Sequence, residues 1–389
     1  MRLAVISFKE CWRGPEGAWY SYGGFPAQMT AIAALFDSAT LCVVEGPARR
    51  GGIPLPPGAR VVPLRSPAGA DGRRKLSVLS RLPEYWRAMS EVVRQADVVH
   101  TPVPGDIALL GMVAALAHQK RLIARYGGSW TPTSETTLMN RVTRQIMRSN
   151  AGGRNVMLAT GAGQTPPAPR MAWVYATAIT RDEVARLRPD LARPAGAPVE
   201  VVYAGRLSPE KGVADLIEAM VHLRADGVGP TRLHLTLAGD GPAGAQIRAR
   251  VAAAGLGGVT FAGQLDRSAL MAALMTADLC VLPSLTESFC KARLDAMLCG
   301  TPVLTTEVGC GRALVGADGE RGWIVPAKSP AAIAARLAGV QSEALDWPAL
   351  RRRCRAFAES YTVEGWGECI GKIAAAQWGV QVVNGRLVG

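Results

Sequence analysis

The sequence has no apolar run long enough to cross a membrane. Its longest uncharged apolar stretch, Ile107 to Ala117, is far shorter than the roughly 20 residues that a spanning helix needs. The N-terminus has one charge before a short apolar run and then reaches Lys9 and Glu10, which is typical of a first strand and not of a signal peptide. We therefore expect a cytoplasmic protein, with peripheral attachment to the inner membrane face left open.

The usual metal and cofactor motifs are also missing. Eight cysteines occur without a CxxC pair or a histidine at zinc-finger spacing. This favours reduced, buried thiols, which pack as small apolar side chains. No GxGxxG loop follows a predicted strand, so a nicotinamide-dependent dehydrogenase is not expected. We expect no metal and no cofactor.

Positive charge is concentrated in the first half of the chain. Residues 1–180 contain 21 Lys and Arg against 10 Asp and Glu, a net charge of +11 out of +13 for the whole protein. Such a surface attracts an anionic partner, either a membrane carrying anionic lipid or an acidic acceptor. A basic amphipathic pattern over 73–94 fits lipid docking, or simply a solvated helix face over a core stripe. No recognisable nucleic-acid-binding motif accompanies the charge, so nucleic acid is not expected.

Length and patterning indicate two α/β domains. At 389 residues with 49% apolar composition, the chain can build two cores. After the turn-rich segment 193–198, strands and helices alternate strictly, which specifies a doubly wound parallel sheet. We expect Rossmann-like domains at 1–192 and 199–360 that face a cleft, and a C-terminal helix and tail, 361–389, that packs back on the first domain. The strands expected in the second domain are 199–204, 233–238, 259–262, 279–283 and 302–305.

The segment GRLSPEKG, residues 205–212, follows one of these strands and opens a helix. Gly205 permits a tight turn, Arg206 offers a planar fork of donors, and Lys211 adds a mobile positive charge. The start of the next helix adds a partial positive charge, so the loop suits a diphosphate. A solvated surface loop with two cations is the alternative.

Two later segments of the second domain belong to the same pattern. AGDGP is another strand-to-helix turn, and the segment from Thr286 to Gly311 places Glu287 after a strand and Asp295 eight positions later on a helix. Amides at the start of that helix would face the same point as the phosphate loop. The further donor-site candidates are Gly239, Asp240, Gly241, Ser288, Phe289 and Cys290.

In this order and at this spacing, the three motifs resemble the retaining glycosyltransferases of the GT-B fold grouped as family 4, the glycosyl transferases group 1. The resemblance covers about 199–326. It implies that a sugar is moved from a nucleotide-diphosphate donor to a carbohydrate or lipid-linked acceptor, in bacterial polysaccharide or glycolipid synthesis. It further implies that Arg206 and Lys211 hold the diphosphate and that Glu287 contacts the transferred sugar, these three being the catalytic candidates. The family's second glutamate, which contacts the ribose, is Asp295 here.

The resemblance is looser over the first domain. Gly23 and Gly24 look like the family's glycine loop, but its usual histidine after a later strand corresponds to Gly127. Acceptor activation is therefore unassigned. This departure, together with Asp295, leaves open a non-catalytic scaffold that binds nucleotide or an anionic partner. The remaining candidates on the acceptor side are His100, for which a structural role is favoured, Arg125 and Tyr126.

Overall fold

The structure is a computed structural model that describes the chain except residues 50, 70, 131, 133–135, 193–196, 230–231 and 343–344, and except the side chains at 71–73, 75 and 341–342. The chain forms two compact units. Met1–Thr180 and Val363–Gly389 make up unit 1, and Arg181–Thr362 makes up unit 2. Most of the segment expected to link the domains, 193–196, lies outside the described residues.

Unit 2 begins earlier than the sequence indicated. Residues 181–192 group with unit 2 instead of with the first domain. Two interactions of their first helix explain this: Glu183 binds Arg267, and the carbonyl of Val184 accepts a hydrogen bond from Arg355 at 2.6 Å.

Unit 1 is built on a parallel sheet whose main run of strands is β5-β3-β1-β6-β7-β8-β9, with β2 and β4 added antiparallel beyond a bulge in β1. Its strands are β1 (Arg2–Arg13), β2 (Trp19–Ser21), β3 (Ser38–Glu45), β4 (Ile53–Pro54), β5 (Arg60–Arg65), β6 (Val98–Val103), β7 (Arg121–Tyr126), β8 (Asn155–Thr160), β9 (Met171–Val174), β16 (Gln381–Val383) and β17 (Arg386–Val388). Its helices are α1 (Phe25–Ala33), α2 (Asp71–Ser80), α3 (Leu82–Gln95), α4 (Asp106–Ala117), α5 (Leu138–Asn150) and α14 (Val363–Trp378).

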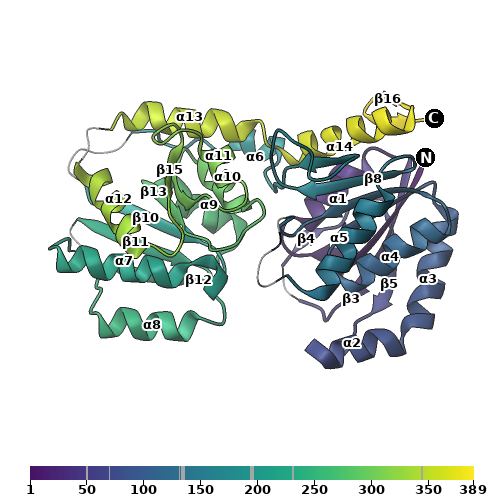
Figure 1. Cartoon of the computed structure of the whole chain (residues 1–389), viewed down its shortest axis with the longest axis horizontal. Coiled ribbons are helices and arrows are strands. Elements are labelled where there is room, and N and C mark those ends of the chain that lie inside the picture. Colours follow the sequence, from purple (N-terminus) through teal and green to yellow (C-terminus); the bar gives the residue numbers. More distant parts are fainter. Residues whose placement is uncertain are drawn as a thin grey trace. The chain divides into compact units, whose positions relative to one another are not determined.

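Helices cover both faces of this sheet. One core layer contains side chains of α3, α4 and α5, and the opposite layer contains side chains of α1 and α14. The helix α14, yellow in Figure 1, supplies the fully buried Trp366 and Ile370 to the second layer. The last 27 residues of the chain therefore belong to unit 1, and α14 packs into its core.

Unit 2 contains a purely parallel six-stranded sheet in the order β12-β11-β10-β13-β14-β15. Its strands are β10 (Val199–Ala204), β11 (Leu233–Ala238), β12 (Val259–Gly263), β13 (Leu279–Leu282), β14 (Val303–Thr306) and β15 (Gly322–Val325). Its helices are α6 (Arg181–Arg186), η1 (Pro209–Lys211, a 3-10 turn), α7 (Val213–Ala225), α8 (Gly244–Ala253), α9 (Arg267–Thr276), α10 (Lys291–Leu298), α11 (Gly311–Val315), α12 (Pro330–Ser342) and α13 (Trp347–Glu359).

The expected α/β class is confirmed, since both sheets follow the doubly wound strand order. In unit 2 the order reverses between β10 and β13. Ligands of open α/β sheets bind beyond the carboxyl ends of the strands at such a switch point. The loops after β10 and β13 are therefore where a site is expected, and both carry predicted donor residues.

The basic segment 73–94 is two helices broken at Arg81, and not one. In α3 the apolar stripe is ordinary core, because Tyr85, Met89 and Val93 are buried. In α2, by contrast, Leu76 and Leu79 are 67% and 63% exposed. Of the described side chains in these two helices, those of Leu76 and Leu79 in α2 are thus the apolar ones most available to a surface partner.

None of the eight cysteines forms a disulfide, and six are buried, as the composition indicated. Over the described residues, no helix combines the length and apolar character needed to span a bilayer.

Candidate functional site

Three loops of unit 2 meet through backbone contacts at the carboxyl end of its sheet. The amide of Leu207 donates to the carbonyl of Asp240 at 3.0 Å, and the amide of Leu285 donates to the carbonyl of Glu210 at 2.9 Å. The loop after β10 is thereby fixed to the loops after β11 and β13.

Glycine is required for this approach. A Cβ added to Gly239 would lie 1.8 Å from the carbonyl oxygen of Gly205, and one added to Gly212 would lie 2.0 Å from that of Pro283. Gly212 also has a φ of +66°, in the left-handed region. The predicted glycines Gly205 and Gly239 thus set the spacing of the loops.

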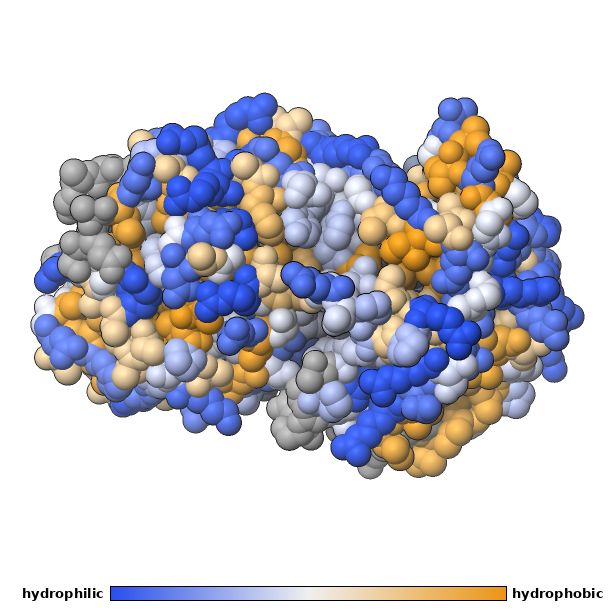
Figure 2. All heavy atoms as spheres, turned by 45° about the horizontal axis from the view of Figure 1, so that its top comes forward, coloured by the Kyte–Doolittle hydropathy of each residue, from blue (hydrophilic) through white to orange (hydrophobic). Residues whose placement is uncertain are grey.

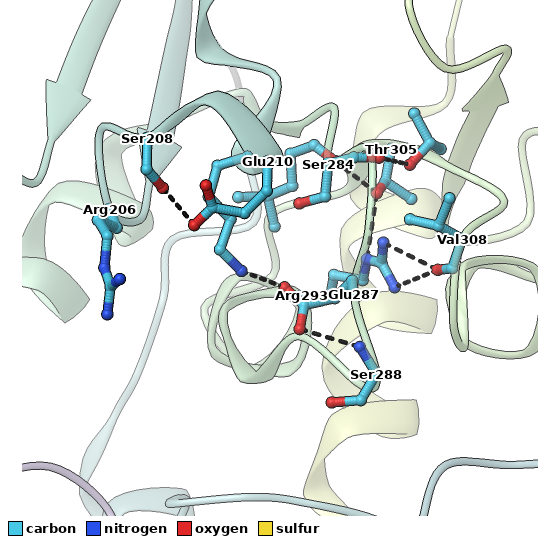
Figure 3. A network of polar contacts seen from close by, with 12 residues as sticks. Arg206, Ser208, Glu210, Ser284, Glu287, Ser288, Arg293, Thr305 and Val308 are labelled. Atoms are coloured by element: carbon cyan, nitrogen blue, oxygen red, sulfur yellow. Dashed lines mark hydrogen bonds and ion pairs between the residues drawn. The ribbon is translucent and has the colours of Figure 1, made fainter. Parts of the chain in front are cut away.

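Lys211 and Glu287 form an ion pair across the switch point, between their Nζ and Oε2 atoms. Their side chains are 27% and 13% exposed. The other carboxylate oxygen of Glu287 accepts the amide of Ser288 at 3.1 Å. Figure 3 shows Glu287 between this amide and the loop after β10. The structure therefore brings two of the three catalytic candidates together.

Arg206 lies in the same loop and is exposed. Its carbonyl accepts a hydrogen bond from the buried Tyr203 hydroxyl at 2.7 Å, which holds the backbone. Its guanidinium points away from the Glu287 network in Figure 3. Next to it, Ser208 donates to Glu210 at 2.5 Å, and this hydrogen bond lowers the pKa of Glu210. Arg206 is thus a cation presented by a rigid loop.

A buried arginine supports the Glu287 loop from beneath. The wholly buried Arg293 of α10 donates to Thr305 Oγ1 at 3.1 Å and to the carbonyl of Val308 at 3.4 Å (Figure 3). The adjacent Gly309 has a φ of +62°, and a Cβ there would lie 2.6 Å from the carbonyl of Glu287. Sequence reasoning missed Arg293, although an arginine at a core position of a helix was a usable signal.

The three predicted residues after Glu287 differ in role. Ser288 is partly exposed, whereas the ring of Phe289 is buried and lies 6.4 Å from the ring of Tyr361. Cys290 precedes α10 with a φ of +59°, a strained conformation for a non-glycine residue, and burial raises the pKa of its thiol. The side chain of Phe289 belongs to the core, so only its backbone is available to a ligand.

Asp295 is buried and ion-paired. Its Oδ1 lies 3.2 Å from Nη1 of Arg267, which also binds Glu183 of α6. Burial raises the pKa of Asp295, and the positive charge of Arg267 offsets part of this rise. Arg267 and Glu183 were not predicted, because neither lies in a recognisable motif. Of the remaining donor candidates, Asp240 is exposed and caps its own turn by accepting the amide of Gly241 at 2.7 Å.

The acceptor-side candidates all lie in unit 1. Gly23 is exposed with a φ of +73°, and the buried Gly24 directly precedes α1. Tyr126 is buried and packs edge-on against Trp130 at 5.6 Å. The structure gives Tyr126 a core position, while the two glycines form the turn into α1.

His100 is completely buried, and its Nδ1 donates to the carbonyl of Ile123 at 2.9 Å. Burial, together with the charge of Arg125, lowers its pKa to about 3. Arg125 itself donates to Thr160 Oγ1 at 3.2 Å and to Gln28 Oε1 at 3.3 Å. The ring of His100 is thus neutral and fixed.

Comparison with protein-family models identifies the second half of the chain. Residues 188–360 match the model of "Glycosyl transferases group 1". The second unit therefore resembles the group 1 glycosyltransferases over almost its whole length. A glycogen synthase of Mycobacterium tuberculosis is 38% identical over 176 residues, which are 44% of this chain and 40% of that protein. The chain thus spans about two fifths of the length of this curated relative.

Solved glycosyltransferase structures extend the likeness to the whole fold. Sucrose-phosphate synthase from Thermosynechococcus elongatus matches with a TM-score of 0.71 at 20% identity, over 97% of this chain and 98% of that one. Anabaena Alr3699/HepE in complex with UDP-glucose matches with a TM-score of 0.66 at 18% identity, over 97% and 100%. These matches confirm the expected GT-B fold.

We expect His100 to remain neutral in the folded protein between about pH 8 and about pH 5. Its folded pKa of about 3 lies below the ordinary 6.5, so between these values the unfolded chain binds more protons. The stability that the neutral ring provides is complete above pH 6.5 and is lost as the pH falls toward 3. The chain has four histidines, so proton NMR can follow each ring. The resonance absent from His100→Gln should not titrate in this range, and a midpoint within it would contradict the assignment.

Proposed function

We propose that the protein is a retaining glycosyltransferase that moves a sugar from a nucleoside diphosphate sugar to a carbohydrate or lipid-linked acceptor, in bacterial polysaccharide or glycolipid synthesis. The observation that carries the proposal is the juxtaposition of Lys211 and Glu287 at the switch point, beside the exposed cation of Arg206. Anabaena HepE, which has a similar fold, was solved in complex with UDP-glucose, and this supports a uridine nucleotide as the first donor to test.

Charge placement explains the chemistry. A departing nucleoside diphosphate develops negative charge, and in this proposal Arg206 and Lys211 stabilise that charge as preorganised cations. In the free protein Glu287 neutralises Lys211, so an arriving diphosphate takes over the lysine and leaves the carboxylate oriented toward the sugar. Asp295, fixed by Arg267, would accept hydrogen bonds from the ribose.

The two carboxylates are expected to respond differently to substitution. Glu287→Gln keeps the shape but removes the charge, so kcat should fall about a hundredfold while UDP binds at least as tightly as to the wild type. Asp295→Ala should weaken UDP binding by about 1–3 kcal/mol through loss of charge-assisted hydrogen bonds. Steady-state kinetics and titration calorimetry measure the two effects.

Glu218→Gln is the matched control, since Glu218 pairs with Arg250 on the surface of α7 at 2.6 Å. It should leave both quantities unchanged. The assignment of the donor site fails if Asp295→Ala binds UDP as tightly as the wild type and Glu287→Gln keeps full turnover. If the wild type binds UDP but neither transfers nor slowly hydrolyses any sugar of a UDP- and GDP-sugar panel, the scaffold alternative replaces catalysis.

We further propose that transfer needs no metal, because Arg206 and Lys211 supply the positive charge at the diphosphate. Turnover should be unchanged after dialysis against EDTA. Loss of activity that Mg²⁺ or Mn²⁺ restores would contradict this proposal, and recovery with buffer alone would not count as restoration.

Unit 1 is proposed to dock reversibly on anionic membranes, which agrees with the net charge of +11 in residues 1–180. In Figure 2 hydrophobic residues form several small patches among hydrophilic ones, and the exposed leucines of α2 offer such side chains for insertion. The protein should sediment with phosphatidylglycerol vesicles at low salt and release at high salt. Leu76→Ser with Leu79→Ser should weaken this binding, whereas Val382→Ser on the C-terminal hairpin should not. Equal sedimentation with phosphatidylcholine vesicles would refute the electrostatic docking.

A further inference from the structure

A group of polar side chains lies on one face of the unit 1 sheet, under α1 and α14. Arg125 stands near the end of β7, and its guanidinium carbon lies 5.5 Å from the ring centre of Trp366 in α14. Gln28 of α1 is buried, accepts a hydrogen bond from Arg125, and donates one to the carbonyl of Thr177 at 3.0 Å. The orientation of Gln28 is therefore fixed from both ends of its amide.

The donors of this group exceed the acceptors around them. Arg125 has five N–H groups, of which the described protein atoms accept two, at Thr160 and Gln28. Its Nε is buried without a partner among the described residues, and the indole Nε1 of Trp366 is in the same state. Buried donors are almost always satisfied in folded proteins, so a water or a ligand group is expected at these atoms.

Among the described residues, no carboxylate compensates the charge of Arg125. Burial alone lowers its pKa to about 10, with no contribution from a carboxylate. The charge of Arg125 acts on His100, whose ring is neutral and supplies no compensating charge. The start of α1, which has no side-chain cap, adds a partial positive charge near Gln28. A partly buried, uncompensated cation is costly, and an anion removes that cost.

We infer that Arg125 is the centre of an anion subsite in unit 1 that selects acceptors carrying a phosphate group. The planar fork of arginine matches phosphate oxygens, and the indole N–H of Trp366 adds a neutral donor. The part of the inference that assigns the phosphate to an acceptor rests on the proposed function. The phosphate site itself does not depend on that function. Arg125 is then a specificity determinant and does not act on the reacting atoms.

The test follows the indole N–H resonance of Trp366, assigned by its absence from Trp366→Phe, in NMR spectra of the full chain. Inorganic phosphate is added at constant ionic strength. We expect a saturable shift in the wild type and at least tenfold weaker binding in Arg125→Gln. Arg121→Gln is the matched control, because Arg121 lies on the same strand and also stacks on a tryptophan, Trp378, at 5.4 Å. It should bind phosphate as the wild type does.

Absence of a saturable shift in the wild type, or equal shifts in all three proteins, would overturn the inference. A second arm replaces phosphate with phosphatidylcholine vesicles containing phosphatidate. A response to free phosphate alone assigns the subsite to a soluble acceptor, and a stronger response to the vesicles assigns it to a lipid headgroup.

Arg206→Gln separates this inference from the proposed function. It should weaken UDP binding while the phosphate response of Trp366 persists. If Arg206→Gln leaves UDP binding intact, the donor site is wrong and the anion subsite stands. If Arg125→Gln alone leaves phosphate binding intact, the subsite is wrong and the donor site stands.

Discussion

The contact of backbone with backbone at the carboxyl end of the second sheet is the constraint on which the site depends. Gly239 lies against Gly205, Gly212 against Pro283, and Gly309 against the carbonyl of Glu287. Side chains at these positions would push the loops so far apart that the backbone hydrogen bonds between them would break. Because the loops cannot separate, Lys211 and Glu287 meet although they are 76 positions apart in the sequence.

The two units differ in the partners of their buried and half-buried cations. In unit 2 two buried or half-buried cations have carboxylate partners: Lys211 pairs with Glu287, and Arg267 pairs with both Glu183 and Asp295. In unit 1 Arg125 is surrounded by neutral oxygens and an indole ring. Ion pairs hold side chains in place before a ligand arrives, whereas a cation without a counter-ion keeps its attraction for one.

Much of unit 2 could be predicted because its signals are local. The strands 199–204 and 233–238 coincide with the observed β10 and β11, since each is an apolar run bounded by turn residues. The interactions of Asp295 could not be predicted, because Glu183 lies 84 residues from the arginine that joins them. The burial of Tyr126 against Trp130 could not be predicted either, because a strand pattern does not reveal which ring packs inward.

The discontinuity of unit 1 has a consequence for how the protein is made. Trp366, Ile370 and Ala374 complete its core, yet they follow the whole of unit 2 in the chain. During synthesis the whole of unit 2 leaves the ribosome before unit 1 is complete. Until α14 follows, the apolar face that it covers in unit 1 is unprotected. A nascent chain therefore exposes this face throughout the translation of unit 2, and chaperones have that interval in which to bind it.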